Sequence, residues 1–434
     1  MKCQYKHPWK DDYVCPEEAL PDSKEHFCIF HERRKDKDVG EFYKKIDEKI
    51  KQEDFNFTGY FFPDDVSFEN VEFTKEVNFG FATFKEKANF SHATFKEKAY
   101  FNSISFKGTT NFRSATFTEG AYFRDTIFTK GAYFRDTIFI KTAGFEGAKF
   151  TEETNFMAAT FAEKASFKGA KFTKKADFRY ATFSGITYFR DVCFNEEVFF
   201  ERTFFSDSTH IRLHSECNLS KASFYGSNCE RVDFSGSKWN EDDKEIIIFE
   251  EKKGIRRGDE RAFDFQVLED IYRRLKQSHQ RFGDHDRAGK FYYREMESRR
   301  KHQKETKQRI NHLWSETLRL TCGYGERPRR TAILALGIIT LWALFYFFGG
   351  IVHITNGTET IINYDLATRL TPNLTQLFYD FLWALYTSIV TFTSLGYGDL
   401  HPTGWSRLAT SIEVFIGVFM VALFLFVFTR KMVR

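Results

Sequence analysis

The sequence lacks the features of several common protein classes. The net charge is only +4 over 434 residues, so we expect no nucleic-acid partner. There is no P-loop, no dinucleotide-binding fingerprint and no convincing catalytic triad, and we therefore do not expect an enzyme. Residues 1–10 are polar and lack the apolar core of a signal peptide, so we expect the chain ahead of its first apolar run to stay in the cytoplasm.

Cysteine is scarce as well, with 7 copies that we expect to be free or metal-bound rather than paired in a reducing compartment. Residues 1–54 are too short and polar to build a core, yet they contain four candidate Zn²⁺ ligands, Cys3, Cys15, Cys28 and His31. The two-residue gap between Cys28 and His31 lets both bind one ion. The segment is therefore either a structural Zn²⁺ site, in which His7 could replace Cys15, or a stretch with three free thiols and a surface histidine.

Phenylalanine is abundant instead, with 54 copies. From Phe68 to Phe205 it recurs at alternating steps of five and six residues, in two interleaved series with a period of eleven. A small or β-branched residue stands two positions before nearly every one of these phenylalanines. Such a period suits neither a helix nor an ordinary strand, and it indicates a solenoid of short β-segments joined by corners.

In these residues the chain resembles the pentapeptide-repeat family, whose units coil as a right-handed quadrilateral β-helix. The resemblance covers residues 55–240, and residues 217–239 return to strict steps of five. The sixth residue in alternate units predicts a coil made of two elevens with looser corners on two sides. Eight such coils would extend roughly 40 Å at the strand spacing of about 4.8 Å.

The outward positions of the repeat carry both charges: residues 68–205 contain 20 Lys+Arg and 17 Asp+Glu. This mixture counts against the acidic, DNA-mimicking rods of the pentapeptide family, and it is typical of a solvated face or of a surface that docks a cytoplasmic protein. Residues 241–330 have helical spacing and predict a hairpin, a third helix and a cap on the open end of the rod. Residues 298–330 hold ten Lys+Arg against three Asp+Glu, as expected beside the cytoplasmic face of a membrane.

The last hundred residues carry two apolar runs of membrane length. Residues 331–351 have no charge, and residues 408–428 have one, Glu413. Because basic residues flank both runs on the same side, we expect a multi-pass protein of the cell membrane with cytoplasmic N- and C-termini. Residues 377–391 form an apolar segment too short to span, which predicts a re-entrant helix whose backbone is buried in protein or faces water.

A glycine-rich turn follows this helix, Thr393-Ser394-Leu395-Gly396-Tyr397-Gly398-Asp399, and here residues 331–434 resemble the two-span potassium channels. The resemblance implies a selectivity filter in which the carbonyls of residues 394–397 replace the water shell of K⁺. It places Tyr397 behind the filter, Asp399 at its outer mouth and Gly417 at a hinge of the inner helix. Because one chain supplies a quarter of the ring, it also implies a homotetramer.

Two residues depart from the consensus of that filter, since Ser394 replaces threonine and Leu395 replaces valine. The sequence therefore predicts a K⁺-selective channel whose repeat domain regulates gating or docks a partner. A non-selective cation channel and a membrane-anchored scaffold with a non-conducting pore remain the alternatives. For Glu413 we expect a place behind the filter, hydrogen-bonded to the pore helix near Tyr386 or Thr387, with a pH-sensing role as the alternative.

Overall fold

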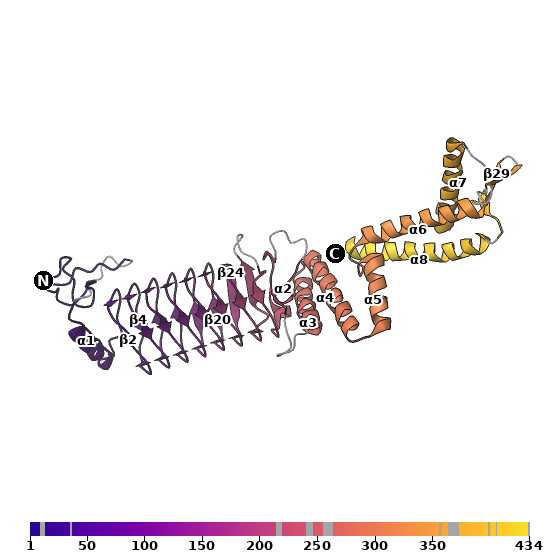
Figure 1. Ribbon diagram of the computed structural model, residues 1–434. Helices are drawn as coiled ribbons and strands as arrows, with labels where there is room; N and C mark the ends of the chain where they lie inside the picture. The colour runs from indigo at the N-terminus through magenta and orange to yellow at the C-terminus, as the bar shows by residue number, and fades with distance from the viewer. Residues whose placement is uncertain are drawn as a thin grey trace. The chain divides into compact units, whose positions relative to one another are not determined.

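The computed structural model describes residues 1–8, 14–34, 37–213, 219–239, 246–254, 264–355, 358–362, 373–397, 400–404 and 406–432. The chain divides into two compact units, Met1–Glu295 and Met296–Arg434. The first unit is a parallel β-solenoid with helices at its ends, and the second is mainly helical (Figure 1).

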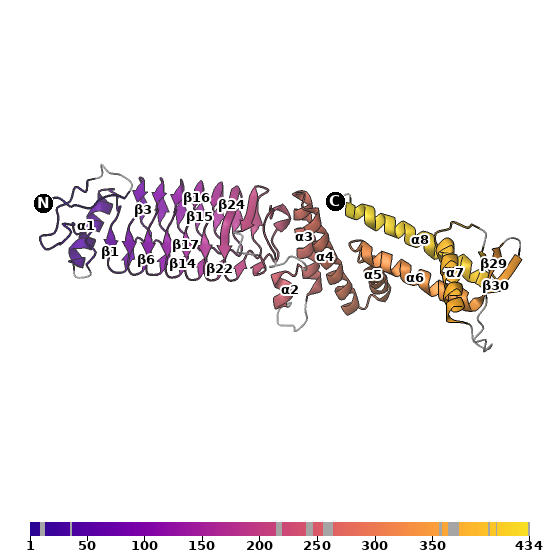
Figure 2. The same ribbon diagram turned by 90° about the horizontal axis from the view of Figure 1, so that it is seen from above.

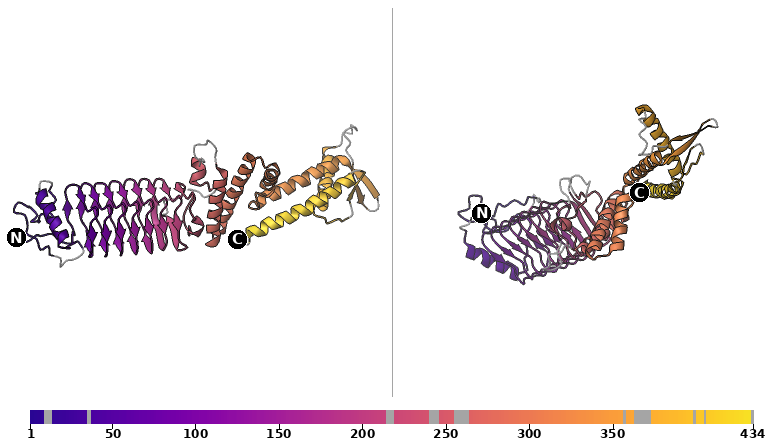
Figure 3. Two further views of the ribbon diagram at one scale, coloured as in Figure 1. Left: turned by 90° about the horizontal axis from the view of Figure 1, so that it is seen from below. Right: turned by 45° about the vertical axis from the view of Figure 1, so that its right-hand side comes forward.

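The solenoid stacks short parallel strands, most of them two residues long, one coil above the next (Figure 3). Phe84 on β5 (Thr83–Phe84) pairs with Phe106 on β9 (Ser105–Phe106), so each coil uses 22 residues, or two of the predicted elevens. Seven strands follow one another along this row, from β1 (Phe61–Phe62) to β24 (Ile186–Phe194). The predicted β-helix is confirmed, with about seven coils rather than eight.

Three long sheets run along the described part of the solenoid. The largest has 13 strands and extends from β1 through β24 to β4 (Val77–Asn78). It combines two faces, because the nine-residue β24 turns a corner without a break and pairs with both β20 (Lys164–Ser166) and β21 (Lys171–Phe172). The other two sheets have 8 strands, from β2 (Val66–Ser67) to β28 (Ala222–Ser223), and 7 strands, from β3 (Glu72–Phe73) to β26 (Phe204–Phe205).

The phenylalanines fill the interior as four columns of rings. Phe134 is fully buried and stacks on Phe156 of the next coil, with ring centroids 4.7 Å apart and planes 5° apart. It meets Phe145 of the adjacent column edge-on, at 5.5 Å and 89°. Both geometries suit aromatic rings, and each such pair adds about 0.5–1.5 kcal/mol to the burial of apolar area. The alanines two positions earlier leave room for the rings.

The corners differ from the expectation. In the five-residue units the amide of Ala82 donates to the carbonyl of Phe79 at 3.0 Å, and Phe81 between them has φ 60°. This is a type II turn, whose third residue needs a positive φ. The turn recurs every eleven residues, at His92 and Asp125 among others. The unusual backbone therefore lies in the five-residue corners and not at the extra sixth residue.

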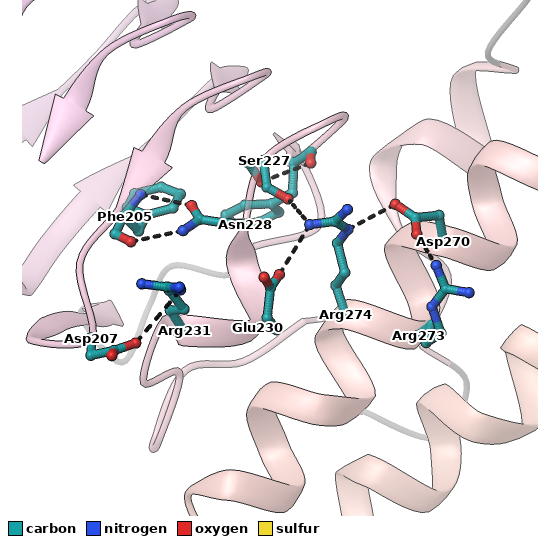
Figure 4. Close-up of polar contacts among 10 residues, drawn as sticks. Phe205, Asp207, Ser227, Asn228, Glu230, Arg231, Asp270, Arg273 and Arg274 are labelled. Carbon is teal, nitrogen blue, oxygen red and sulfur yellow. Dashed lines mark hydrogen bonds and ion pairs between the residues drawn. The ribbon is translucent and has the colours of Figure 1, made fainter.

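Helices cover the C-terminal end of the solenoid, through α2 (Phe249–Lys253), α3 (Phe265–Arg281) and the first half of α4 (His285–Glu305). Asn228 imitates a further strand, because its side-chain amide accepts from the Phe205 amide at 2.7 Å and donates to the Phe205 carbonyl at 2.8 Å. Arg274 of α3 donates to the Ser227 carbonyl and to Glu230 (Figure 4). These contacts satisfy a strand edge that would otherwise be open to other chains.

The second unit holds α5 (Arg309–Cys322), α6 (Pro328–Gly349), α7 (Leu374–Phe392) and α8 (Ser406–Met432). α6 and α8 run side by side, and α7 crosses α6 at a steep angle (Figures 1 and 2). A small antiparallel sheet lies where α6 ends and α8 begins, with β29 (Ile351–Thr355) between β30 (Thr358–Ile362) and β31 (Leu400–Pro402).

The expectation about cysteines was wrong at one position. Cys3, Cys15, Cys28, Cys229 and Cys322 are free thiols, Cys193 is disulfide-bonded, and Cys217 lies outside the described residues. Cys193 lies on β24, the strand that turns the corner between two faces.

Candidate functional site

Two helices of the described residues, α6 and α8, are long and apolar enough to cross a membrane. Their 22 and 27 residues correspond to about 33 and 40 Å of helix. Pro328 opens α6 at the first helical position, where its missing amide hydrogen costs no hydrogen bond. Arg430 near the end of α8 lies 3.4 Å from Glu326 just before α6, so both basic flanks stand at the same end of the helix pair.

The third helix, α7, begins where Asn373 accepts a hydrogen bond from the Thr375 amide, and it is a few residues longer than the predicted 377–391. It ends in a Schellman motif, in which the Leu395 amide donates to the Val390 carbonyl and the Ser394 amide to the Thr391 carbonyl, both at 3.0 Å. Ser394 takes the left-handed conformation that this motif requires, with φ 58°. The predicted filter sequence therefore starts directly at the carboxyl end of α7.

Residues 393–397 are exposed on the surface of the single chain. Gly396 has φ 58°, and a Cβ built there would meet nothing within 4 Å. Leu395 exposes 57% and Tyr397 67% of its surface, so the described residues of one chain leave Tyr397 largely uncovered, and its place behind the filter stays a prediction. Gly398 and Asp399 lie outside the described residues.

Glu413 of α8 links all three helices and is fully buried. Its carboxylate accepts from Tyr346 of α6 and from Ser388 of α7, both at 2.5 Å. The sequence placed Glu413 against α7, but near Tyr386 or Thr387. The partner is Ser388, and the second bond to α6 was not foreseen. Two hydroxyl donors satisfy a carboxylate that would otherwise be costly inside a membrane.

Gly417 packs against the end of α7. A Cβ at this position would fall on the Phe392 carbonyl, which is part of the helix backbone and cannot rotate away. α8 is an uninterrupted helix through Gly417. The hinge stays a prediction, but this glycine also has a packing role, because it lets α8 approach the carboxyl end of α7.

A pocket of about 320 Å³ is lined by the carboxyl end of α7, by Ser394 and Gly396 of the predicted filter, and by β31 and α8. Tyr386 and Val390 line it from α7, and Thr410 and Val414 line it from α8. The pocket thus lies between the predicted filter segment and the helices of the same chain.

Outside this region, the structure brings together the four predicted metal ligands. Cys3, Cys15, Cys28 and His31 are all buried, and their ligand atoms lie within 4.8 Å of one another. His7 is not in this cluster, because its ring packs edge-on against Phe81 with centroids 5.2 Å apart.

A second Gly-Tyr-Gly sequence, residues 323–325, has a structural role. Gly323 ends α5 in the left-handed conformation, and Tyr324 is buried with its hydroxyl 2.9 Å from Glu297 of α4. Gly325 lies against the guanidinium of Arg430, which is 3.0 Å from the position of an added Cβ. The turn therefore connects α4 to the end of α8.

Sequence reasoning missed the β29–β30 hairpin and the role of Ser388 and Tyr346. The hairpin had a signal, since Asn356-Gly357 between the runs beginning at Ile351 and Thr358 is a strong hairpin dipeptide. No sequence signal distinguishes Ser388 from its neighbour Thr387, because only the rotation of α7 decides which hydroxyl faces Glu413.

Comparisons with known families agree with this arrangement. Residues 359–434 match the ion channel family model. Residues 90–138 and 145–192 match a family model that describes nine copies of the pentapeptide repeat, and residues 214–238 match a second model, which describes eight copies. The chain combines pentapeptide repeats with an ion channel domain. No curated protein and no solved structure matched it.

Proposed function

We propose that four copies of this chain form a K⁺-selective channel in the cell membrane, with cytoplasmic termini. The observation that carries the proposal is the position of residues 394–397. They leave the carboxyl end of a crossing helix, α7, which is fixed between two membrane-length helices through Glu413. The common position of the two basic flanks supports the proposed orientation.

The proposed mechanism follows from the backbone at this position. A helix carries a partial negative charge at its carboxyl end, so four α7 helices aimed at one axis would attract a cation. Successive carbonyls of residues 394–397 would then replace the water shell of the ion. One chain presents these residues at its surface, with Leu395 and Tyr397 largely exposed, and this exposure supports assembly around a shared pore.

Selectivity depends on Ser394 and Leu395. Ser394 keeps a hydroxyl at the inner mouth, and its small side chain suits the left-handed backbone there better than a β-branched residue would. A non-selective cation pore is the alternative. Reversal potentials in opposed K⁺ and Na⁺ gradients separate the two: a value near the K⁺ equilibrium potential supports selectivity, and a value near zero excludes it.

The β-solenoid is proposed to regulate gating or to dock a cytoplasmic protein. A physical route exists within the second unit, where Tyr324 bonds to Glu297 of α4 and Glu326 pairs with Arg430 at the end of α8. A force on α4 would thus reach the inner helix at the end opposite the filter. A membrane-anchored scaffold with a silent pore is the alternative from another class of function.

Flux through purified protein in liposomes tests the channel. Gly396→Asp is expected to abolish K⁺ flux while the tetramer persists. Gly404→Asp is the matched control, because Gly404 also has a positive φ of 50° and open space around it, but lies beyond the filter. Equal flux from both variants would refute the assignment of the filter, and no flux from the intact protein would favour the scaffold.

A further inference from the structure

The segment ahead of the solenoid holds a cluster of four side chains that the channel does not use. The Sγ atoms of Cys15 and Cys28 are 3.9 Å apart. Nδ1 of His31 lies 3.1 Å from the Cys28 sulfur and 3.5 Å from the Cys3 sulfur. In a tetrahedral Zn²⁺ site, bond lengths of about 2.3 Å to sulfur and 2.0–2.1 Å to nitrogen place two sulfurs about 3.8 Å apart and a sulfur and nitrogen about 3.5 Å apart. The Cys15–Cys28 and Cys3–His31 distances match these values, the Cys28–His31 distance is somewhat shorter, and all four ligand atoms lie within 4.8 Å of one another.

The hydrogen bonds of His31 fix which ring nitrogen could bind a metal. Nε2 lies 3.1 Å from the Thr58 carbonyl oxygen, which can only accept, so Nε2 carries the proton. In the neutral imidazole Nδ1 then presents its lone pair to the sulfurs. A histidine that donates its other nitrogen to a backbone carbonyl is the usual second contact of a metal ligand. The Tyr5 ring stacks on the imidazole at 3.9 Å and holds its plane.

The Cys3 sulfur also has a contact that suits a metal ligand. The Cys28 amide donates to the Cys3 sulfur at 3.2 Å, a contact that favours a thiolate. A simple core of thiols would not need a buried imidazole with its lone pair aimed at two sulfurs, and a disulfide would join only two of the three cysteines. We propose that Cys3, Cys15, Cys28 and His31 bind one Zn²⁺ as a closed structural site. Four protein ligands leave no open position for chemistry.

The site holds a cap on the first coil of the solenoid. The loop that carries Cys28 and His31 also carries Phe30, whose carbonyl accepts from the Phe61 amide of β1 at 2.8 Å. The Lys37 ammonium joins the same elements, since it donates to the carbonyls of Ile29 and Phe61 at 2.9 and 2.6 Å. Zn²⁺ would thus fix a loop that covers the first edge of the 13-stranded sheet.

The experiment measures metal in the full-length protein purified in detergent without added metal, independently of any ion flux. Mass spectrometry of the metal content is expected to give one Zn²⁺ per chain in the wild type. The ion should be lost in Cys28→Ser and kept in Cys322→Ser. The latter is the control, because Cys322 is a buried thiol of α5 whose bond to the Leu318 carbonyl a serine can also make.

A second measurement locates the effect. After chelation, hydrogen exchange of the Phe61 amide should accelerate roughly fivefold or more, because a free energy of about 1 kcal/mol per lost hydrogen bond no longer opposes local opening. The Phe134 amide in the middle of the solenoid, bonded to the Asn155 carbonyl, should not change. A folded wild type without stoichiometric zinc, a Cys15–Cys28 disulfide in peptide maps, or unchanged exchange at Phe61 would each overturn the proposal.

Discussion

Replacing Gly417 by alanine tests how closely α8 packs against the carboxyl end of α7, where the predicted filter begins. The new methyl group would fall on the Phe392 carbonyl, so α7 must move or α8 must bend away. Overpacking of this kind costs typically 1–3 kcal/mol, and a rigid backbone atom favours the upper end, about 3 kcal/mol. Alanine also returns about 1 kcal/mol of helix propensity relative to glycine. We therefore expect a net loss of about 2 kcal/mol per chain.

Gly337 provides the matched control. It lies inside α6 and has nothing within 4 Å of an added Cβ, so Gly337→Ala retains only the propensity gain of about 1 kcal/mol. The two variants should shift the thermal midpoint of the assembled protein in opposite directions, measured by tetramer survival on heating in detergent. A Gly417→Ala protein at least as stable as wild type, with only its gating changed, would refute the packing role and leave the hinge alone.

Three further outcomes are expected. Burial raises the pKa of Glu250 from 4.5 to about 7, so between these values the folded state holds a proton that the unfolded state has lost. Stability should then fall as the pH rises from 4.5 to 7, by on the order of 3 kcal/mol, and Glu250→Gln should remove this slope from thermal midpoints taken at several pH values. Asn228→Ala leaves the Phe205 amide and carbonyl without their partners, which should cost about 1–3 kcal/mol and speed hydrogen exchange at Phe205; unchanged exchange would count against the cap. Charge reversal at Glu326 alone should alter open probability in single-channel records, and reversal of both Glu326 and Arg430 should restore it; failure of the double variant would show that the pair is not the coupling element.

Much of the solenoid could be predicted because one side chain fixes its register. A phenylalanine at each eleven-residue step is expected in the interior. Because every coil then places its phenylalanines alike, the pairing of Phe84 with Phe106 follows. The corners could not be predicted in the same way. A positive φ occurs at residues as different as Phe81, His92 and Asp125, because the turn is imposed by stacking between coils and not by the residue itself.

The channel domain shows the same limit. The sequence predicts the order of a membrane-length helix, a crossing helix, a filter and a second membrane-length helix. The three helices α6, α7 and α8 occur in that order. The partners of Glu413 depend on how α6 and α7 are rotated against α8. That rotation cannot be read from the sequence. From the sequence, the three cysteines and the histidine could be either free side chains or metal ligands. In the structure Cys3, Cys15, Cys28 and His31 lie side by side.

We propose that residues 394–397 of four chains conduct K⁺. The most direct test is a reconstituted wild-type protein in liposomes with K⁺ inside and Na⁺ outside, compared with Gly396→Asp and Gly404→Asp. We expect K⁺ efflux that sets a membrane potential near the K⁺ equilibrium value, lost in Gly396→Asp and kept in Gly404→Asp. Absence of flux from folded tetramers of the wild type, or equal passage of Na⁺, would contradict it.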